Sequence, residues 1–140
     1  MRDYQQSKLY SWQNTIPQGG VIKIENAQSI VDHIWAAEGL KYPPKVQPIH
    51  FNTTKWAGKA DRMNIYLQSE VSMQTIIHEV AHSLTMDIDD NCAQHGPWFV
   101  GVYTKLIEKY LGVSMPVMLY TLNKYDVDTN VLAHPIFLDD

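Results

Sequence analysis

Three residues in the middle of the chain have the types and the spacing that metal chemistry needs. His78 and His82 are four positions apart, so on a helix they lie one above the other on the same face and can hold one metal ion. Glu79 points to the flank of this pair, where its carboxylate can reach a metal-bound water but not the metal itself. A zinc hydrolase needs this arrangement, whereas the simpler interpretation is two ordinary solvated histidines.

The residues around this pattern predict that it is helical. Apolar side chains recur at i, i+3, i+4, i+7 and i+11 from Met73, and this period marks a helix face turned toward a core. At about 100° per residue, the two histidines fall roughly opposite that face. The sequence therefore predicts a helix with one histidine side and one apolar side, the latter formed by Met73, Ile76, Ile77, Val80 and Leu84.

A third histidine, His95, stands just before a second predicted helix. Pro97 suits the first turn of that helix and Gly112 suits the position just past its end. A polar connector of about 8 to 10 residues is long for two packed helices, but it can fold back and bring His95 to the metal. Three nitrogen ligands and an open fourth position would follow. The apolar positions of the second helix are Phe99, Val102, Tyr103, Leu106, Ile107 and Tyr110.

The run HEVAH, followed after twelve residues by HGPWF, resembles the SprT-like metallopeptidases and the related short HExxH proteins called minigluzincins. The resemblance covers roughly residues 27 to 112 and is specific at these two motifs and the helices that carry them. It implies that His78, His82 and His95 bind one zinc ion per chain, and that Glu79 is the general base that activates the zinc-bound water. The implied activity is hydrolysis of peptide bonds in a protein or peptide substrate.

The resemblance also implies an α+β, zincin-like fold in which a small mixed sheet packs against the metal-bearing helix and neighbouring helices. Residues 1–140 are expected to form one such domain, with a core at about 27–112 and a C-terminal extension at about 113–140 that matches nothing in the family. In zincins an exposed edge strand near the active helix holds the substrate backbone by strand addition. We expect such a strand here, without a choice between the candidates.

Composition narrows the possible partners. The 140 residues suit one domain with a real core, and 11 basic against 15 acidic side chains leave a net charge of −4. This balance gives no electrostatic reason to expect binding to nucleic acid or to an anionic membrane. The sequence also has neither the basic nor the cysteine-rich module that follows the protease core in SprT-like repair proteins. The single cysteine, Cys92, excludes an intrachain disulfide and favours a reducing compartment. No stretch reads as a secretory signal or a membrane span, so a cytoplasmic protein is expected.

Further elements are predicted along the rest of the chain. Residues 1–20 suggest no element and close with a turn at Gly19-Gly20, and residues 21–25 form a short strand or a lead-in to the next helix. That helix spans 26–38, capped by Asn26 or Ser29 and ended by Gly39. Strands are predicted at 46–52 and 62–68, with a further short strand possible between them, and a third long helix from 114–116 to about 125.

Several alternatives stay open. Glu108 is a rival third ligand, as in thermolysin-like enzymes, but these place an aspartate four residues on, where this chain has Gly112. A non-catalytic binding or regulatory protein with a structural metal would need a fourth donor, such as Cys92 or an aspartate within 87–90. His33 and His134 are interpreted as surface histidines. The residue that stabilises the oxyanion is not chosen among Tyr103, Tyr120, Tyr125, Arg62 and His134.

Overall fold

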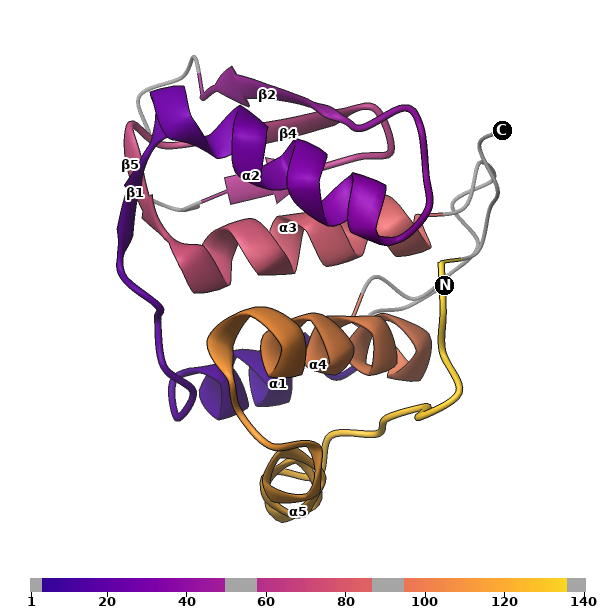
Figure 1. Ribbon diagram of the computed structural model, residues 1–140. Coiled ribbons are helices and arrows are strands. Elements are labelled where there is room, and N and C mark those ends of the chain that lie inside the picture. The colour runs from indigo at the N-terminus through magenta and orange to yellow at the C-terminus, as the bar shows by residue number, and fades with distance from the viewer. Residues whose placement is uncertain (1–3, 50–57, 87–94, 136–140) are drawn as a thin grey trace.

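The computed structural model describes residues 4–49, 58–86 and 95–135, which form an α+β domain, as predicted (Figure 1). These residues contain five helices and two small sheets. The helices are α1 (Gln6–Gln13), α2 (Ile24–Ala37), α3 (Met73–Thr85), α4 (Pro97–Leu111) and α5 (Met115–Lys124). The strands are β1 (Val21–Lys23), β2 (Lys45–Pro48), β3 (Gly58–Ala60), β4 (Asn64–Leu67) and β5 (Glu70–Ser72). Across these described ranges, no helix combines the length and the apolar character needed to cross a bilayer.

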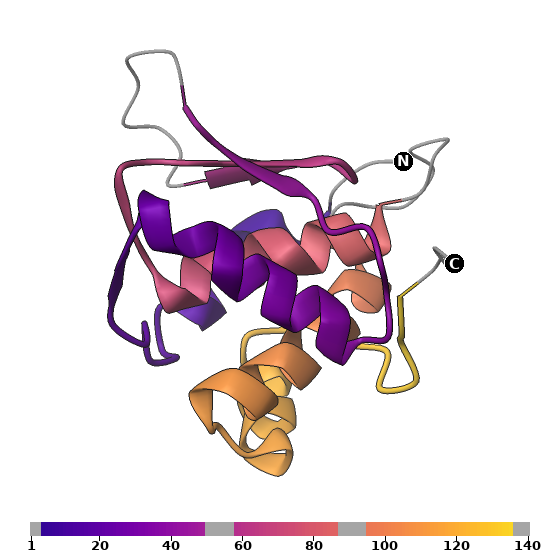
Figure 2. The ribbon, with the colours of Figure 1, turned by 45° about the horizontal axis from the view of Figure 1, so that its top comes forward.

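The metal-bearing helix predicted from the sequence is α3, and it lies at the centre of the molecule. Ser72 caps its first turn by accepting a hydrogen bond from the backbone N–H of Thr75. The sheet and α2 cover one side of α3, while α4 and α1 cover the other (Figures 1 and 2). The histidine side of α3 is therefore buried as well, and the interpretation of two solvated histidines is wrong.

Two sheets frame the start and the outer side of α3. In the larger sheet β4 is central, paired in parallel with β2 and antiparallel with β3, and the buried side chains of Ile65 and Leu67 alternate with less buried neighbours. In the smaller sheet β1 pairs antiparallel with β5. The strand predicted at 62–68 is present as β4 and is shorter than predicted. The short strand considered possible between the two predicted strands is β3. The strand predicted at 46–52 is present as β2, and residues 50–52 lie outside the described residues.

Helix α2 forms where it was predicted, but its cap differs. It begins at Ile24, with Lys23 at the cap position and no side-chain capping bond, so the predicted caps Asn26 and Ser29 are wrong. The Ser29 hydroxyl instead donates to the carbonyl of Asn26 inside the helix. The helix ends as predicted before Gly39, which has a φ of 78°.

Helix α1 was not predicted. Its alternation of polar and apolar residues is weak, and only Leu9 and Trp12 are buried. Its position is set by long-range bonds: the Trp12 indole donates to the Thr121 hydroxyl, and the Gln74 side-chain amide donates to the carbonyls of Gln13, Ile16 and Pro17. Tertiary contacts therefore stabilise a helix that its own sequence specifies poorly.

Helices α4 and α5 form as predicted. Gly96 and Pro97 begin α4, Gly112 ends it with a φ of 70°, and the side chain of Ser114 caps α5 by accepting from the backbone N–H of Val117. The described part of the extension packs tightly on α4, because a Cβ atom on Gly101 would lie 2.0 Å from the Asn130 carbonyl oxygen. This extension therefore belongs to the packed domain.

The turn after α1 allows a test of how closely it packs on α3 and α4. Gly19 and Gly20 both have positive φ, but their surroundings differ. A Cβ atom on Gly19 would lie 2.4 Å from Cδ2 of Leu111 and 2.9 Å from Cβ of Met73, whereas one on Gly20 meets nothing within 4 Å. We expect Gly20→Ala to cost about 1–2 kcal/mol of backbone strain, and Gly19→Ala to cost on the order of 1–3 kcal/mol more through overpacking. Chemical denaturation of both variants measures the difference. Equal destabilisation would contradict the close approach of Gly19 to Met73 and Leu111.

Candidate metal centre

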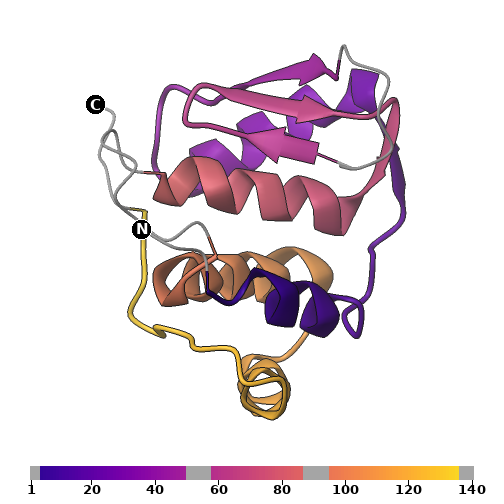
Figure 3. The same cartoon turned by 180° about the vertical axis from the view of Figure 1, so that it is seen from behind.

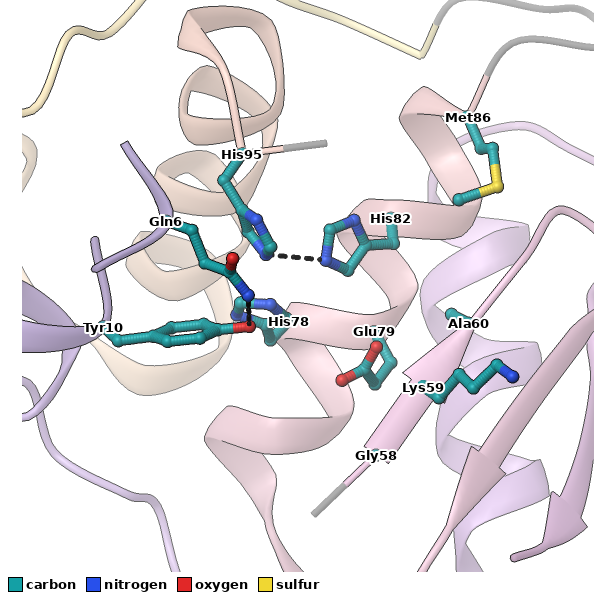
Figure 4. Close-up of a pocket in the computed structure, with 10 residues that line it drawn as sticks. All are labelled: Gln6, Tyr10, Gly58, Lys59, Ala60, His78, Glu79, His82, Met86 and His95. Atoms are coloured by element: carbon teal, nitrogen blue, oxygen red, sulfur yellow. Dashed lines mark hydrogen bonds between the residues drawn. The ribbon is translucent and has the colours of Figure 1, made fainter. Parts of the chain in front are cut away.

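The three predicted ligands meet at one point. His78 and His82 come from α3, and His95 comes from the segment just before α4 (Figure 4). One ring nitrogen from each histidine can be chosen so that all three lie within 4.8 Å of one another. The Nε2 atoms of His82 and His95 are 3.1 Å apart. The described residues thus bring together three imidazoles close enough to bind a metal ion.

The spacing of these nitrogens suits a small divalent cation. Two nitrogen ligands of a tetrahedral zinc ion lie roughly 3.3 Å apart, because each Zn–N bond is about 2.0–2.1 Å long. The His82–His95 separation of 3.1 Å is close to this value, while the widest separation in the cluster, up to 4.8 Å, would contract on binding. Nitrogen-only donors favour zinc and other transition metals over magnesium or calcium, which prefer oxygen.

Burial keeps the imidazoles in the form that binds metal. The exposed fractions of His78, His82 and His95 are 6%, 9% and 3%. Burial, with a contribution from the neighbouring charge of His95, lowers the pKa of His78 to about 3. Burial and the two neighbouring histidines also hold the pKa of His82 well below its ordinary value. Both rings on α3 are therefore neutral near pH 7, as a metal ligand must be.

Phe99 on α4 forms an apolar wall behind the histidines. Its ring stacks on His82 with centroids 4.3 Å apart, and it meets His95 edge-on at 5.3 Å. Phe99 is itself 2% exposed, so it has little freedom to move. The Phe99 ring also lies 5.1 Å from that of His78, so the packing of α4 on α3 restricts the orientation of all three imidazoles.

Gln13 at the end of α1 orients the imidazole ring of His78. Its side-chain oxygen lies 3.0 Å from Nδ1 of His78 and also accepts a hydrogen bond of 3.1 Å from the Tyr103 hydroxyl. Because an amide oxygen only accepts, Nδ1 of His78 carries the proton, and Nε2 is the nitrogen left with a lone pair for the metal. Gln13 therefore favours the tautomer of His78 whose Nε2 can accept a metal ion.

Glu79 lies beside the cluster, against the β3 strand. A Cβ atom on Gly58 would lie 3.0 Å from both Cγ and Oε2 of Glu79, so a larger residue at that position would require the Glu79 side chain to shift. Burial raises the pKa of Glu79 to about 8. A divalent cation nearby would favour the ionised carboxylate and counteract this effect of burial.

The cluster opens into a cavity of about 310 Å³. Helix α1 forms one wall and β3 the opposite wall, with α3 between them (Figures 3 and 4). The histidine cluster is therefore buried on the α4 side and accessible from the cavity. The lining residues are Gln6, Tyr10, Gly58, Lys59, Ala60, His78, Glu79, His82, Met86 and His95.

Most of the alternative site residues do not reach this cavity. Glu108 is exposed, and its carboxylate accepts from the backbone N–H of Met115, so it is not the third ligand. Tyr103 is buried next to His78, but its hydroxyl donates to Gln13. Four other candidates for the oxyanion role do not line the cavity: Tyr120, Tyr125, Arg62 and His134.

Two surface interpretations are confirmed, and one set of candidates is untested. His33 and His134 are exposed, as the sequence predicted. The possible fourth donors, Cys92 and the aspartates within 87–90, lie outside the described residues.

The sequence analysis missed three residues that shape the centre: Tyr10 and Gln13 on α1, and Gly58 on β3. The only local signal for α1 is the spacing of Leu9 and Trp12, which is too short a pattern to predict a helix. Gly58 is recognisable only from its distance to Glu79. All three contribute through tertiary contacts.

The role of Gln13 predicts a measurable change in metal affinity. Gln13→Met keeps a side chain of similar length but removes the acceptor for Nδ1 of His78, so we expect the affinity for Zn²⁺ to fall on the order of 10- to 100-fold. Competition with a chromophoric chelator measures this affinity. Gln18→Met, at an exposed position in the following turn, is the matched control. Equal affinities in the two variants would exclude the assigned tautomer role.

Comparison with known proteins adds no further constraint on this centre. No protein-family model, no curated protein and no solved structure matches the chain. A function for the site must therefore be argued from its own residues.

Proposed function

We propose that this protein is a zinc-dependent metallopeptidase with a zincin-like fold, similar to the SprT-like and minigluzincin proteins. One observation carries the proposal: three buried histidines close enough to bind a metal ion share an accessible cavity with a buried carboxylate. A purely structural metal needs neither the cavity nor the carboxylate, whereas a hydrolase needs both.

The proposed mechanism gives Glu79 the central proton transfer. A zinc ion bound by the three histidines would act as a Lewis acid and make a water molecule acidic enough to attack a peptide carbonyl near neutral pH. The Glu79 carboxylate takes the proton from the attacking water and later delivers it to the leaving amine. Its position against Gly58 holds the carboxylate at the edge of the same cavity. Phe99 and Gln13 keep the ligand rings in place during this cycle.

The edge of the larger sheet suggests how a peptide binds. Among the described residues, strand β3 stands last in the order β2-β4-β3 and pairs with β4 on one side. All three of its residues line the cavity. A substrate peptide in extended conformation can add to this edge through backbone hydrogen bonds, which place its carbonyl groups near Glu79. Backbone recognition of this kind suits protein or peptide substrates.

The ligand assignment predicts a pattern of zinc content. Purified wild-type protein should hold about one zinc ion per chain, and His78→Ala, His82→Ala and His95→Ala should each lose most of it because two nitrogens bind zinc far more weakly than three. Glu108→Ala should keep its zinc, since this carboxylate contacts the start of α5. Metal analysis by mass spectrometry gives the ratios. Zinc retained in His95→Ala and lost in Glu108→Ala would reverse the assignment.

The catalytic proposal predicts a separate effect for Glu79→Gln. This change keeps the shape of the side chain but removes its basicity, so zinc content and thermal stability should persist while peptide hydrolysis falls on the order of 10²- to 10⁴-fold. Denatured casein and a broad peptide library are suitable substrates because the specificity is unknown.

Two results would contradict this proposal. Equal cleavage by wild type and Glu79→Gln would identify a contaminating protease or another base. No cleavage, together with a zinc-edge spectrum that counts four protein ligands, would favour a binding or regulatory protein with a structural metal.

A further inference from the structure

Tyr10 is a side chain of α1 that faces the histidine cluster. Its neighbours on the helix, Leu9 and Trp12, are fully buried in the core, whereas Tyr10 is 39% exposed and lines the cavity. Its ring meets that of His95 edge-on, with centroids 5.4 Å apart, and lies 6.0 Å from that of His78. Figure 4 shows the hydroxyl directed into the cavity beside His78, with Glu79 on the β3 side. The phenol and the carboxylate therefore flank the histidine cluster from different walls.

The hydroxyl is held in this position. The Gln6 side-chain amide, one turn earlier on α1, donates a hydrogen bond of 3.3 Å to the Tyr10 oxygen. Helix α1 is itself anchored by Trp12 to Thr121 and by Gln74 to the end of the helix. A donor on a fixed element needs little reorganisation when charge develops near it. A hydrogen bond accepted from Gln6 also makes the phenol proton a better donor.

The other polar side chains that line the described cavity do not fit the same role. The three histidines are metal ligands and Glu79 is the base, which leaves Gln6, Tyr10 and Lys59. The Gln6 amide is directed to Tyr10. The Lys59 ammonium lies 5.9 Å from the ring centroid of Tyr66, and Figure 4 shows this side chain extending away from the histidines. Tyr10 is therefore the donor best placed to meet a substrate at the metal centre.

We infer that Tyr10 is a catalytic residue that donates a hydrogen bond to the oxygen anion formed on the scissile carbonyl. This inference rests on the proposed peptidase function. When the water oxygen bonds to the carbonyl carbon, its proton passes to Glu79 and the carbonyl π electrons move to oxygen. The phenol proton stabilises that negative charge and stays on Tyr10. When the oxygen reforms its double bond, the C–N bond breaks and the amine leaves with the proton from Glu79.

Tyr10→Phe tests this role because it removes the hydroxyl and keeps the ring that packs on the histidines. Tyr120→Phe on the exposed face of α5 is the matched control. The probe is inorganic phosphate, a tetrahedral oxyanion, titrated calorimetrically into the zinc-loaded proteins. We expect Tyr10→Phe to bind zinc as the wild type does but phosphate about 10- to 100-fold more weakly. Its kcat should fall on the order of 10²- to 10³-fold with little change in KM.

The possible results separate this inference from the proposed function. Equal phosphate affinity in wild type and Tyr10→Phe overturns the role of Tyr10 and leaves the peptidase proposal standing. Failure of zinc-loaded wild type to bind phosphate also overturns it, because the cavity then has no oxyanion site. If metal analysis finds no zinc in the wild type, the proposed function fails first and this inference fails with it.

Discussion

The packing of α4 against the histidine side of α3 is the contact on which the centre depends. It buries His78 and His82, brings His95 to them from the start of α4, and places Phe99 against all three rings. Burying imidazoles without an ion has an energetic cost, because protonation is disfavoured and their polar atoms lose water. The hydrogen bond between His82 and His95 and the one between His78 and Gln13 offset part of that cost. A bound cation would offset more of it.

The rest of the fold determines which side of this cluster stays accessible. The sheet and α2 cover the opposite side of α3, while α1 and β3, which lie on either side of α3 in Figure 3, both contribute residues to the cavity. The two walls differ in chemistry. Strand β3 presents a backbone edge and a glycine that leaves space for Glu79, while α1 presents the polar side chains of Gln6 and Tyr10. A ligand in the cavity therefore meets hydrogen-bonding groups on both walls, with the three histidines between them.

Helix α1 links the centre to the extension. Trp12 forms a hydrogen bond with Thr121 of α5. The next residue, Gln13, forms hydrogen bonds with His78 and Tyr103. The described part of the extension also packs on Gly101 of α4. Residues 113–135 thus support α1 and α4, the two helices that pack against the three histidines. This connection gives the extension a physical role in the domain, although it lies outside the family resemblance.

The sequence by itself determined the features that depend on residues a few positions apart. It predicted α3, it predicted α4 with its start and stop signals, and it placed two histidines on one helix face and a strand at 62–68. Local spacing also made His95 a candidate ligand. Only the tertiary structure decided that His95 reaches His78 and His82 and that Glu108 does not. It also decided that the histidine side of α3 is buried. Helix α1 and its Gln13 bond to His78, 65 positions away, had no local signal, because packing stabilises that helix more than its own sequence does.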